Sequence, residues 1–430
     1  MRNNNLTIDV HHVTRVEGHG NILVDVKDGK IETVLWSIPE SPRFFEAMLK
    51  GRYWDEVHHI TSRICGICSI GHTLTSIKAT EAAFGIQPSE QTVMLRKLAL
   101  HGENLQSHIL HCYFLVAPDF LGVPSVIPLA SSHPDVVKMA LRLKKLSNDM
   151  CDLIAGRTTH PVSLVPGGMA KVPTARQLKE LRARLVSSVE DLSATADIFA
   201  TLKMPDFSRE TEYIALTHPS EYALYDGDIA SSDGGTWPAS EYLGIVNEFC
   251  VPHSTAKHSR HNRDSYAVGA LARFNINSTQ LTPLASKVAN KLGLKAARCN
   301  PFMNSVAQVV ESVHSVEESI SIIDRLLERG IQEEPIEVKP VAGRGVGAVE
   351  VPRGILFHDY TYDERGYVVK ANCVIPTNQN HRNIQHDMEA LVPQIMDEPK
   401  EKITLMLEML VRSYDPCISC STHLLSVRFR

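Results

Sequence analysis

The sequence predicts a mainly α-helical protein with small peripheral β-structure, which is an α+β class. Long stretches of helical periodicity dominate the middle of the chain, and alternating apolar and polar runs occur near both ends. The 430 residues contain no low-complexity segment, long linker or internal repeat. We therefore expect one large unit rather than independent domains.

The elements follow in chain order. Residues 1–40 predict a β-meander, because short alternating runs flank the turn-like Lys27-Asp28-Gly29. Residues 41–330 predict a mainly helical core, in which 205–280 reads as loops with a few strands. Residues 331–423 predict a β segment, with strands within 335–376, and then the C-terminal segment. The expected helices span 88–118, 134–155, 175–203, 283–294, 301–329, 381–396 and 398–413.

The composition is that of an ordinary globular protein, with 43% hydrophobic and 22% charged residues. A net charge of −5 gives no reason to expect binding to nucleic acid or to an anionic membrane. The N-terminus lacks an apolar signal core, and no apolar run is long enough to span a membrane. These features predict a cytoplasmic protein with no membrane span.

Two cysteine pairs are the strongest chemical signal. SRICGICSIGH carries Cys65 and Cys68, and DPCISCSTH carries Cys417 and Cys420. The nine cysteines are an odd number without an export signal, so disulfides are not expected and ligation is the better interpretation. Almost the whole chain separates the pairs, unlike a zinc ribbon, so we expect a metal site where its two ends meet. Four thiolates select soft metals, and zinc and a redox metal both remain open.

Three further residues gain meaning only if they converge on these thiols. Glu17 lies in RVEGHG after the first expected strand, and Glu46 lies at an expected helix start in RFFEAMLKGR. Arg353 lies in VPRG between two strand-like runs. Any one of them alone is more often a surface or packing residue.

Two other motifs give weaker evidence for a binding site. AGRGVGA (342–348) resembles a phosphate-binding glycine loop, but a proline-containing strand follows it and offers no helix N-terminus to a phosphate. HSTAKHSRH (253–261) lacks a helical histidine spacing, which favours a polar loop or an interface over a metal site.

Together the motifs resemble the large, catalytic subunit of nickel–iron hydrogenases, and most of all its cytoplasmic, multimeric, NAD(P)-linked, sulfhydrogenase-like branch. The resemblance runs from residue 15 to 423 and implies long central helices with small peripheral sheets. It is carried by RVEGHG, PRFFEAMLKGR, RICGICSIGH, APD, VPRG, VIPTNQN and DPCISCSTH.

The resemblance implies a reversible, heterolytic cleavage of H2. Cys65, Cys68, Cys417 and Cys420 would bind nickel, and Cys68 and Cys420 would also bridge to an iron carrying carbon monoxide and cyanide. The thiolate of Cys417 and the carboxylate of Glu17 would handle the proton.

The resemblance also assigns surrounding residues. Arg353 would lie above the two metals, positioned by Asp119 and Asp415. Pro376 and Thr377 would pack against the small ligands on iron.

A second ion, magnesium or iron, is implied at Glu46, the carbonyl of Cys373 and His423. His72 would hydrogen-bond a cysteine sulfur. Residues 424–430 (LLSVRFR) would be an extension that a maturation endopeptidase removes after nickel-insertion proteins have acted.

The sequence offers no further cysteine cluster and no convincing dinucleotide motif, so the electrons would leave through another chain. The resemblance implies that this partner is a small subunit with iron–sulfur clusters, with diaphorase subunits that bind flavin and NAD(P) beyond it. Two alternatives stay open. One is a structural or hydrolytic zinc protein with a four-cysteine site, and the other is a non-hydrogenase electron-transfer relative of the same fold.

Overall fold

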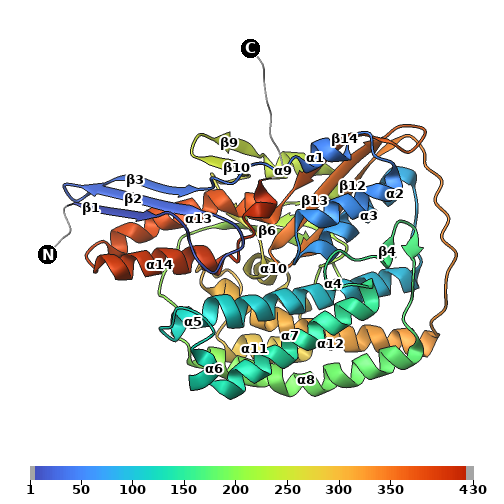
Figure 1. The fold of residues 1–430 in the computed structure, drawn as a ribbon, viewed down its shortest axis with the longest axis horizontal. Helices are drawn as coiled ribbons and strands as arrows, with labels where there is room; N and C mark the ends of the chain where they lie inside the picture. The colour runs from blue at the N-terminus through green and yellow to red at the C-terminus, as the bar shows by residue number, and fades with distance from the viewer. Residues whose placement is uncertain (1–4, 423–430) are drawn as a thin grey trace, which may run out of the picture.

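The computed structural model describes residues 5–422 of the chain. Long helices form one layer, and small sheets with shorter helices form another above it in the view of Figure 1. The mainly α class with peripheral β-structure is confirmed. The helices are α1 Phe45–Leu49, α2 Trp54–Thr61, α3 Ser69–Phe84, α4 Glu90–Leu110, α5 Ala117–Phe120, α6 Leu129–Ser132, α7 Pro134–Ala155, α8 Ala175–Thr201, α9 Tyr242–Val246, α10 Ala270–Asn277, α11 Pro283–Lys291, α12 Met303–Arg329, α13 Pro376–Ile395 and α14 Lys400–Ser413.

The strands form five small sheets among the described residues. The N-terminal sheet has the order β1-β2-β3 and is antiparallel, as the meander predicted. A second antiparallel sheet has the order β12-β13-β14, and the remaining sheets are β11-β6-β7-β8, β10-β9 and β4-β5. The strands are β1 Leu6–Val10, β2 Asn21–Lys27, β3 Lys30–Ser37, β4 Leu164–Val165, β5 Gly168–Met169, β6 Glu212–Thr217, β7 Asp228–Ser231, β8 Thr236–Trp237, β9 Phe249–Val251, β10 Ser254–His258, β11 Tyr266–Ala267, β12 Gly343–Val351, β13 Gly354–Tyr362 and β14 Val368–Val374.

The glycine-rich run is strand β12, and its glycines serve packing against α3. A Cβ added at Gly345 would lie 2.1 Å from the carbonyl oxygen of Ala79, and one at Gly347 would lie 2.1 Å from that of Thr75. Only glycine therefore lets the strand lie this close to the helix. The structure agrees with the expectation that this run is not a phosphate loop.

Two parts of the helical prediction were wrong. The expected helix 88–118 is interrupted, because α4 ends at Leu110 and a π-helical segment, His111–Val116, joins it to α5. Helices α2 and α3 were missed. Nearly every residue of α3 is buried, so its sequence lacks the polar face that reveals a surface helix. Within residues 5–422, no helix is both long enough and apolar enough to cross a bilayer.

Candidate metal centre

The first cysteine pair lies where the chain enters α3. Cys65 follows a short 3₁₀ turn, and Cys68 is the residue immediately before the helix. Both thiols are buried, and the Cys68 backbone N–H donates to Cys65 Sγ at 3.1 Å. The contact with Cys68 and the nearby Arg353 guanidinium lower the pKa of Cys65 to about 7, in spite of its burial. Cys65 is therefore suited to bind a metal as a thiolate.

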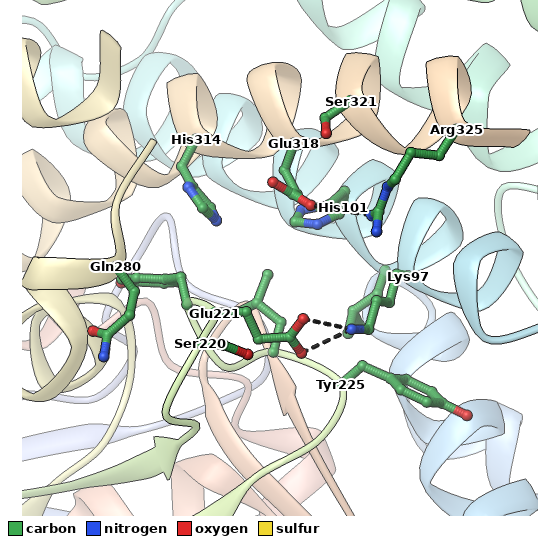
Figure 2. A pocket seen from close by; sticks show the side chains of 13 residues that line it. Lys97, His101, Ser220, Glu221, Tyr225, Gln280, His314, Glu318, Ser321 and Arg325 are labelled. Carbon is green, nitrogen blue, oxygen red and sulfur yellow. Dashed lines mark hydrogen bonds and ion pairs between the residues drawn. The ribbon is translucent and has the colours of Figure 1, made fainter. Parts of the chain in front are cut away.

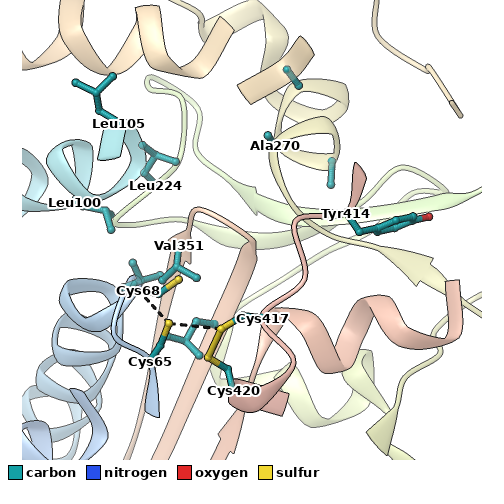
Figure 3. Packing of buried hydrophobic residues seen from close by; sticks show 14 of the residues in the cluster. Cys65, Cys68, Leu100, Leu105, Leu224, Ala270, Val351, Tyr414, Cys417 and Cys420 are labelled. Atoms are coloured by element: carbon teal, nitrogen blue, oxygen red, sulfur yellow. Dashed lines mark hydrogen bonds between the residues drawn. A yellow bond between two sulfur atoms is a disulfide. The ribbon is translucent and has the colours of Figure 1, made fainter. Parts of the chain in front are cut away.

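The second pair follows α14 and meets the first, as predicted (Figure 3). The sulfurs of Cys65 and Cys417 lie 3.6 Å apart, and the sulfurs of Cys65, Cys417 and Cys420 all lie within 4.8 Å of one another. These buried, soft donors fit nickel, iron or zinc. Cys68 is not part of this three-sulfur group, but it lies beside it, because its backbone N–H bonds the Cys65 sulfur.

The structure joins Cys417 and Cys420 in a disulfide, so the expectation that the chain has no disulfide is wrong at this pair. The two Cα atoms are 5.5 Å apart, a separation that the Cys-x-x-Cys spacing permits and that a disulfide readily spans. Metal ligation by both sulfurs requires the reduced thiolates.

Arg353 reaches the cysteines from the tip of a tight hairpin. Val351 pairs with Gly354 across the β12–β13 turn, which leaves Pro352 and Arg353 as its two loop residues. The guanidinium donates to Cys68 Sγ at 3.1 Å, to the Asp415 carboxylate at 2.9 Å and to the Asp415 carbonyl at 2.7 Å. It is buried, and its fixed charge stabilises thiolates beside it.

Glu17 reaches the site from the loop between β1 and β2. Its backbone carbonyl accepts from the Ile418 N–H at 2.9 Å, and its Oε2 accepts from the Ser419 N–H at 3.0 Å. The same oxygen lies 3.2 Å from Cys417 Sγ. Gly18 permits this approach, because a Cβ there would lie 2.7 Å from that of Ile418. The carboxylate is thus held against the Cys417 sulfur.

Asp119 does not take the predicted place beside Arg353. It forms ion pairs with Arg15 and, at 2.8 and 2.9 Å, with the buried Arg412. Asp119 lies in α5, directly after the π-helical segment. Its partners there come from the N-terminal loop, Arg15, and from the end of α14, Arg412. Asp415 alone of the two predicted acids holds Arg353.

The remaining predicted site residues lie close by. Thr377 Oγ1 accepts from the Cys417 N–H at 3.0 Å, and Pro376 begins α13 beside it. His72 Nδ1 lies 3.2 Å from His358 Nε2, and its bond to a cysteine sulfur stays a prediction.

At the predicted second ion site, Glu46 and Cys373 are buried near each other. Burial raises the pKa of Cys373 well above its usual value, and the Glu46 carboxylate raises it further. His423 and residues 424–430 lie outside the described residues.

Sequence reasoning missed Glu103, a fully buried carboxyl group beside the first cysteine pair. Its side chain accepts the N–H groups of Ile70 at 2.7 Å and of Gly71 at 3.0 Å, so it caps the first turn of α3. Burial raises its pKa well above the usual value. Its position in α4 gives no local signal, because the turn that it caps lies about thirty residues earlier.

Comparison with known proteins agrees with this geometry. A model of the family described as nickel-dependent hydrogenase matches residues 43–138 and 252–423. The alpha subunit of sulfhydrogenase 1 from Pyrococcus furiosus is 34% identical, over 98% of this chain and 99% of its own. The F420-non-reducing hydrogenase vhc subunit of Methanococcus voltae is 30% identical, over 97% of this chain and 94% of its own.

Solved structures show the same fold. An NAD+-reducing [NiFe]-hydrogenase in its H2-reduced state superposes with a TM-score of 0.88, at 25% identity, over 97% of this chain and 99% of that one. A Ni-Fe-Se hydrogenase from D. vulgaris Hildenborough gives 0.77 at 23% identity, over 97% and 100%. This chain therefore belongs to the nickel-dependent hydrogenase family, as a large, catalytic subunit of the nickel–iron type.

Proposed function

We propose that Cys65, Cys68, Cys417 and Cys420 hold the nickel and iron at which this subunit cleaves H2 reversibly. The approach of the Cys65 and Cys417 sulfurs to 3.6 Å, from opposite ends of the chain, carries the proposal. Bound there, the metal pair supplies the redox chemistry that separates H2 into protons and electrons, with carbon monoxide and cyanide as the further ligands of iron.

The residues around the sulfurs would move the proton and fix the geometry. Glu17 Oε2, 3.2 Å from Cys417 Sγ, takes the proton and passes it outward. Arg353 holds Cys68 Sγ and is itself held by Asp415, so that a fixed positive charge faces the reaction. Thr377 fixes the Cys417 backbone, and Pro376 and Thr377 shape the pocket for the ligands of iron. Asp119 would support the site only indirectly, by joining Arg412 to the N-terminal loop.

A second ion, magnesium or iron, would bind Glu46, the Cys373 carbonyl and His423 and fix the C-terminal segment. Residues 424–430 would be removed by a maturation endopeptidase after nickel insertion, leaving the rest as one unit. The predicted cytoplasmic location belongs to the same proposal.

The electrons would leave through a separate iron–sulfur subunit. Among residues 5–422, the only group of three or more potential ligands is Cys65, Cys417 and Cys420, which leaves no second cluster for an electron relay. Diaphorase subunits with flavin and NAD(P) would lie beyond that partner; the NAD+-reducing structural relative supports NAD(P) as the acceptor.

Metal analysis with infrared spectroscopy tests the proposal. We expect one nickel for each large subunit and iron in excess of nickel, because the iron–sulfur partner also holds iron, with absorption bands of metal-bound carbon monoxide and cyanide. Cys420→Ser should abolish both the bands and H2 uptake while the chain is still made. Stoichiometric zinc without nickel or iron would contradict the proposal and favour a zinc protein.

A further inference from the structure

Residues 40–43, between β3 and α1, contact both of the segments that carry the cysteines, and we call them the bridging segment. Its two charged members are Glu40 and Arg43. The chain turns at the next residue, Phe44, whose φ of 59° lies in the left-handed region that an aromatic residue rarely adopts. Such strained residues persist where the surrounding structure fixes them, and they are frequent at functional sites.

Arg43 joins the two cysteine pairs through a single nitrogen of its half-buried side chain. Its Nη2 donates to the Ile64 carbonyl at 2.6 Å and to the Ser419 carbonyl at 2.5 Å. Ile64 immediately precedes Cys65, and Ser419 immediately precedes Cys420. The guanidinium therefore holds the peptide group in front of one cysteine of each pair. Hydrogen bonds from a charged donor are among the stronger ones in proteins.

The Ile64 carbonyl is a point at which the two pairs meet. It ends the short 3₁₀ turn Ser62–Ile64, so the turn itself offers it no partner. Besides the guanidinium of Arg43, the sulfur of Cys420 lies 3.5 Å from this oxygen. A shift of this one peptide group would therefore move Cys65 and change the surroundings of the Cys420 sulfur.

The bridging segment holds the C-terminal segment at further points. The Arg43 N–H donates to the Thr422 carbonyl at 2.6 Å. Glu40 Oε1 accepts from the Ser419 hydroxyl at 3.3 Å and from the His19 N–H at 2.6 Å. The N-terminal loop, the bridging segment and the C-terminal segment are thus joined around Ser419.

The HSTAKHSRH run (253–261) anchors the start of the bridging segment. Thr255 Oγ1 donates to the carbonyls of Ile38 and Glu40, at 2.9 and 2.7 Å. The Thr255 N–H bonds the Ile38 carbonyl as well, at 2.9 Å. This polar run therefore fixes one end of the bridging segment, and Arg43 fixes the other end against the cysteines.

We infer that Arg43 is a positioning residue of the metal centre, which holds the two cysteine pairs at the separation that binds the metals and so keeps nickel in place. The inference rests on the proposed function. Arg43 donates only to backbone carbonyls, so it acts through the cysteine backbone and takes no part in bond breaking. Because nickel would be held from both segments, its release requires them to separate, and Arg43 resists that separation.

Hydrogen–deuterium exchange of the reduced, metal-free full chain tests the contact without the metals. The N–H groups of Cys417, Ile418 and Ser419 bond other segments, so they exchange only when the C-terminal segment opens. Arg43→Gln removes the charged donor and should speed this exchange about tenfold or more. Arg43→Lys keeps the charge without the planar guanidinium and should give an intermediate rate.

Nickel release tests the consequence in the purified complex. Transfer of nickel to a chelator should be about tenfold faster in Arg43→Gln than in the parent, with Arg43→Lys between them. The infrared bands of the variant that still holds metals should broaden, because the cysteines are then less firmly placed. The melting temperature, measured beside them, reports any general loss of stability.

Lys97→Gln is the matched control. Lys97 is also a half-buried cation, and it donates to both carboxylate oxygens of Glu221, at 2.8 and 2.6 Å, so it likewise joins parts far apart in the chain. It lines a cavity of about 370 Å³ (Figure 2), whose lining contains none of the four cysteines. Nickel release and the exchange of residues 417–419 should stay as in the parent.

Unchanged exchange of residues 417–419 in Arg43→Gln would overturn the inference, whatever the metals do. An equal acceleration in Lys97→Gln would also overturn it, since the effect would then be a general loss of stability. Faster exchange with unchanged nickel release would refute the retention of nickel by Arg43.

Failure of the proposed function is distinct, because the parent complex would then lack nickel and the infrared bands, while the exchange of the metal-free chain would still report on Arg43. Arg43→Lys keeps the charge and most of the side-chain volume, so it carries the same test if Arg43→Gln does not fold.

Discussion

Replacing Glu17 by glutamine separates the proton-transfer role of this side chain from its structural role. The amide oxygen of glutamine can still accept the Ser419 N–H, now 3.0 Å from Glu17 Oε2, and the backbone bond to Ile418 is untouched. The amide cannot take up a proton from Cys417 Sγ. We therefore expect intact metal binding with lost proton transfer.

The magnitude follows from the contact that is lost. A positioned general base contributes about 10² to 10⁴ in rate, or about 3 to 5 kcal/mol of activation free energy. Exchanging one charge-assisted hydrogen bond for a neutral one should lower the free energy of unfolding by only about 1 kcal/mol. H2 uptake and D2/water exchange measure the change in rate. The nickel and iron content shows whether the metals stay bound, and the melting temperature reports the loss of stability.

Glu17→Asp is the matched control, because it keeps the carboxylate but withdraws it by one methylene group. It should retain more activity than E17Q although its geometry is more disturbed. Exchange in E17Q within a factor of about three of the parent, with metals bound, would refute a proton role for Glu17.

Three further outcomes are expected. Asp119→Asn weakens the buried ion pair with Arg412, so it should lower the free energy of unfolding by an amount of order 3 kcal/mol, and with it the melting temperature. The infrared bands should stay in place. Shifted bands with unchanged stability would contradict this. Arg353→Lys should cut H2 uptake by about 10²-fold or more, because lysine cannot reach Cys68 Sγ and both Asp415 acceptors together; activity within a few-fold of the parent would argue against it. Burial lowers the pKa of His314 from 6.5 to about 4. Between these pH values the unfolded chain binds a proton that the folded chain does not. The free energy of unfolding should therefore fall by about 3 kcal/mol as the pH is lowered from above 6.5 to below 4. His314→Leu should flatten this part of the pH profile of denaturant unfolding, and an unchanged slope would contradict the assignment.

Much of the fold could be read from periodicity. Helix α7 has the predicted bounds, 134–155, because its amphipathic pattern is regular and Pro134 begins it. Helix α3 could not be found in this way, since a helix surrounded by protein has no polar face and its Gly71 and three threonines are weak helix formers.

The candidate site, like the fold, could be predicted only in part from the sequence. The cysteines were predictable because their two motifs are distinctive, whereas Glu17 and Arg353 gained meaning only in combination with them. The structure places both side chains against cysteine sulfurs. The partners of Asp119 and the role of Glu103 depend on which helices lie side by side, which no local pattern specifies. Hydrogen-bond partners far apart in the chain are fixed only by the complete fold.

The contact between Glu17 and the Cys417 segment has a consequence for biosynthesis. A chain is made from its N-terminus at about 5 to 20 residues per second, so roughly 20 to 70 seconds pass between the synthesis of Cys68 and that of Cys417. During that interval the nascent chain can present Cys65 and Cys68, which lie just before α3, without the opposite pair of cysteines, so that a metal carrier can reach them. The order of translation thus provides a time window in which the site is open from one side.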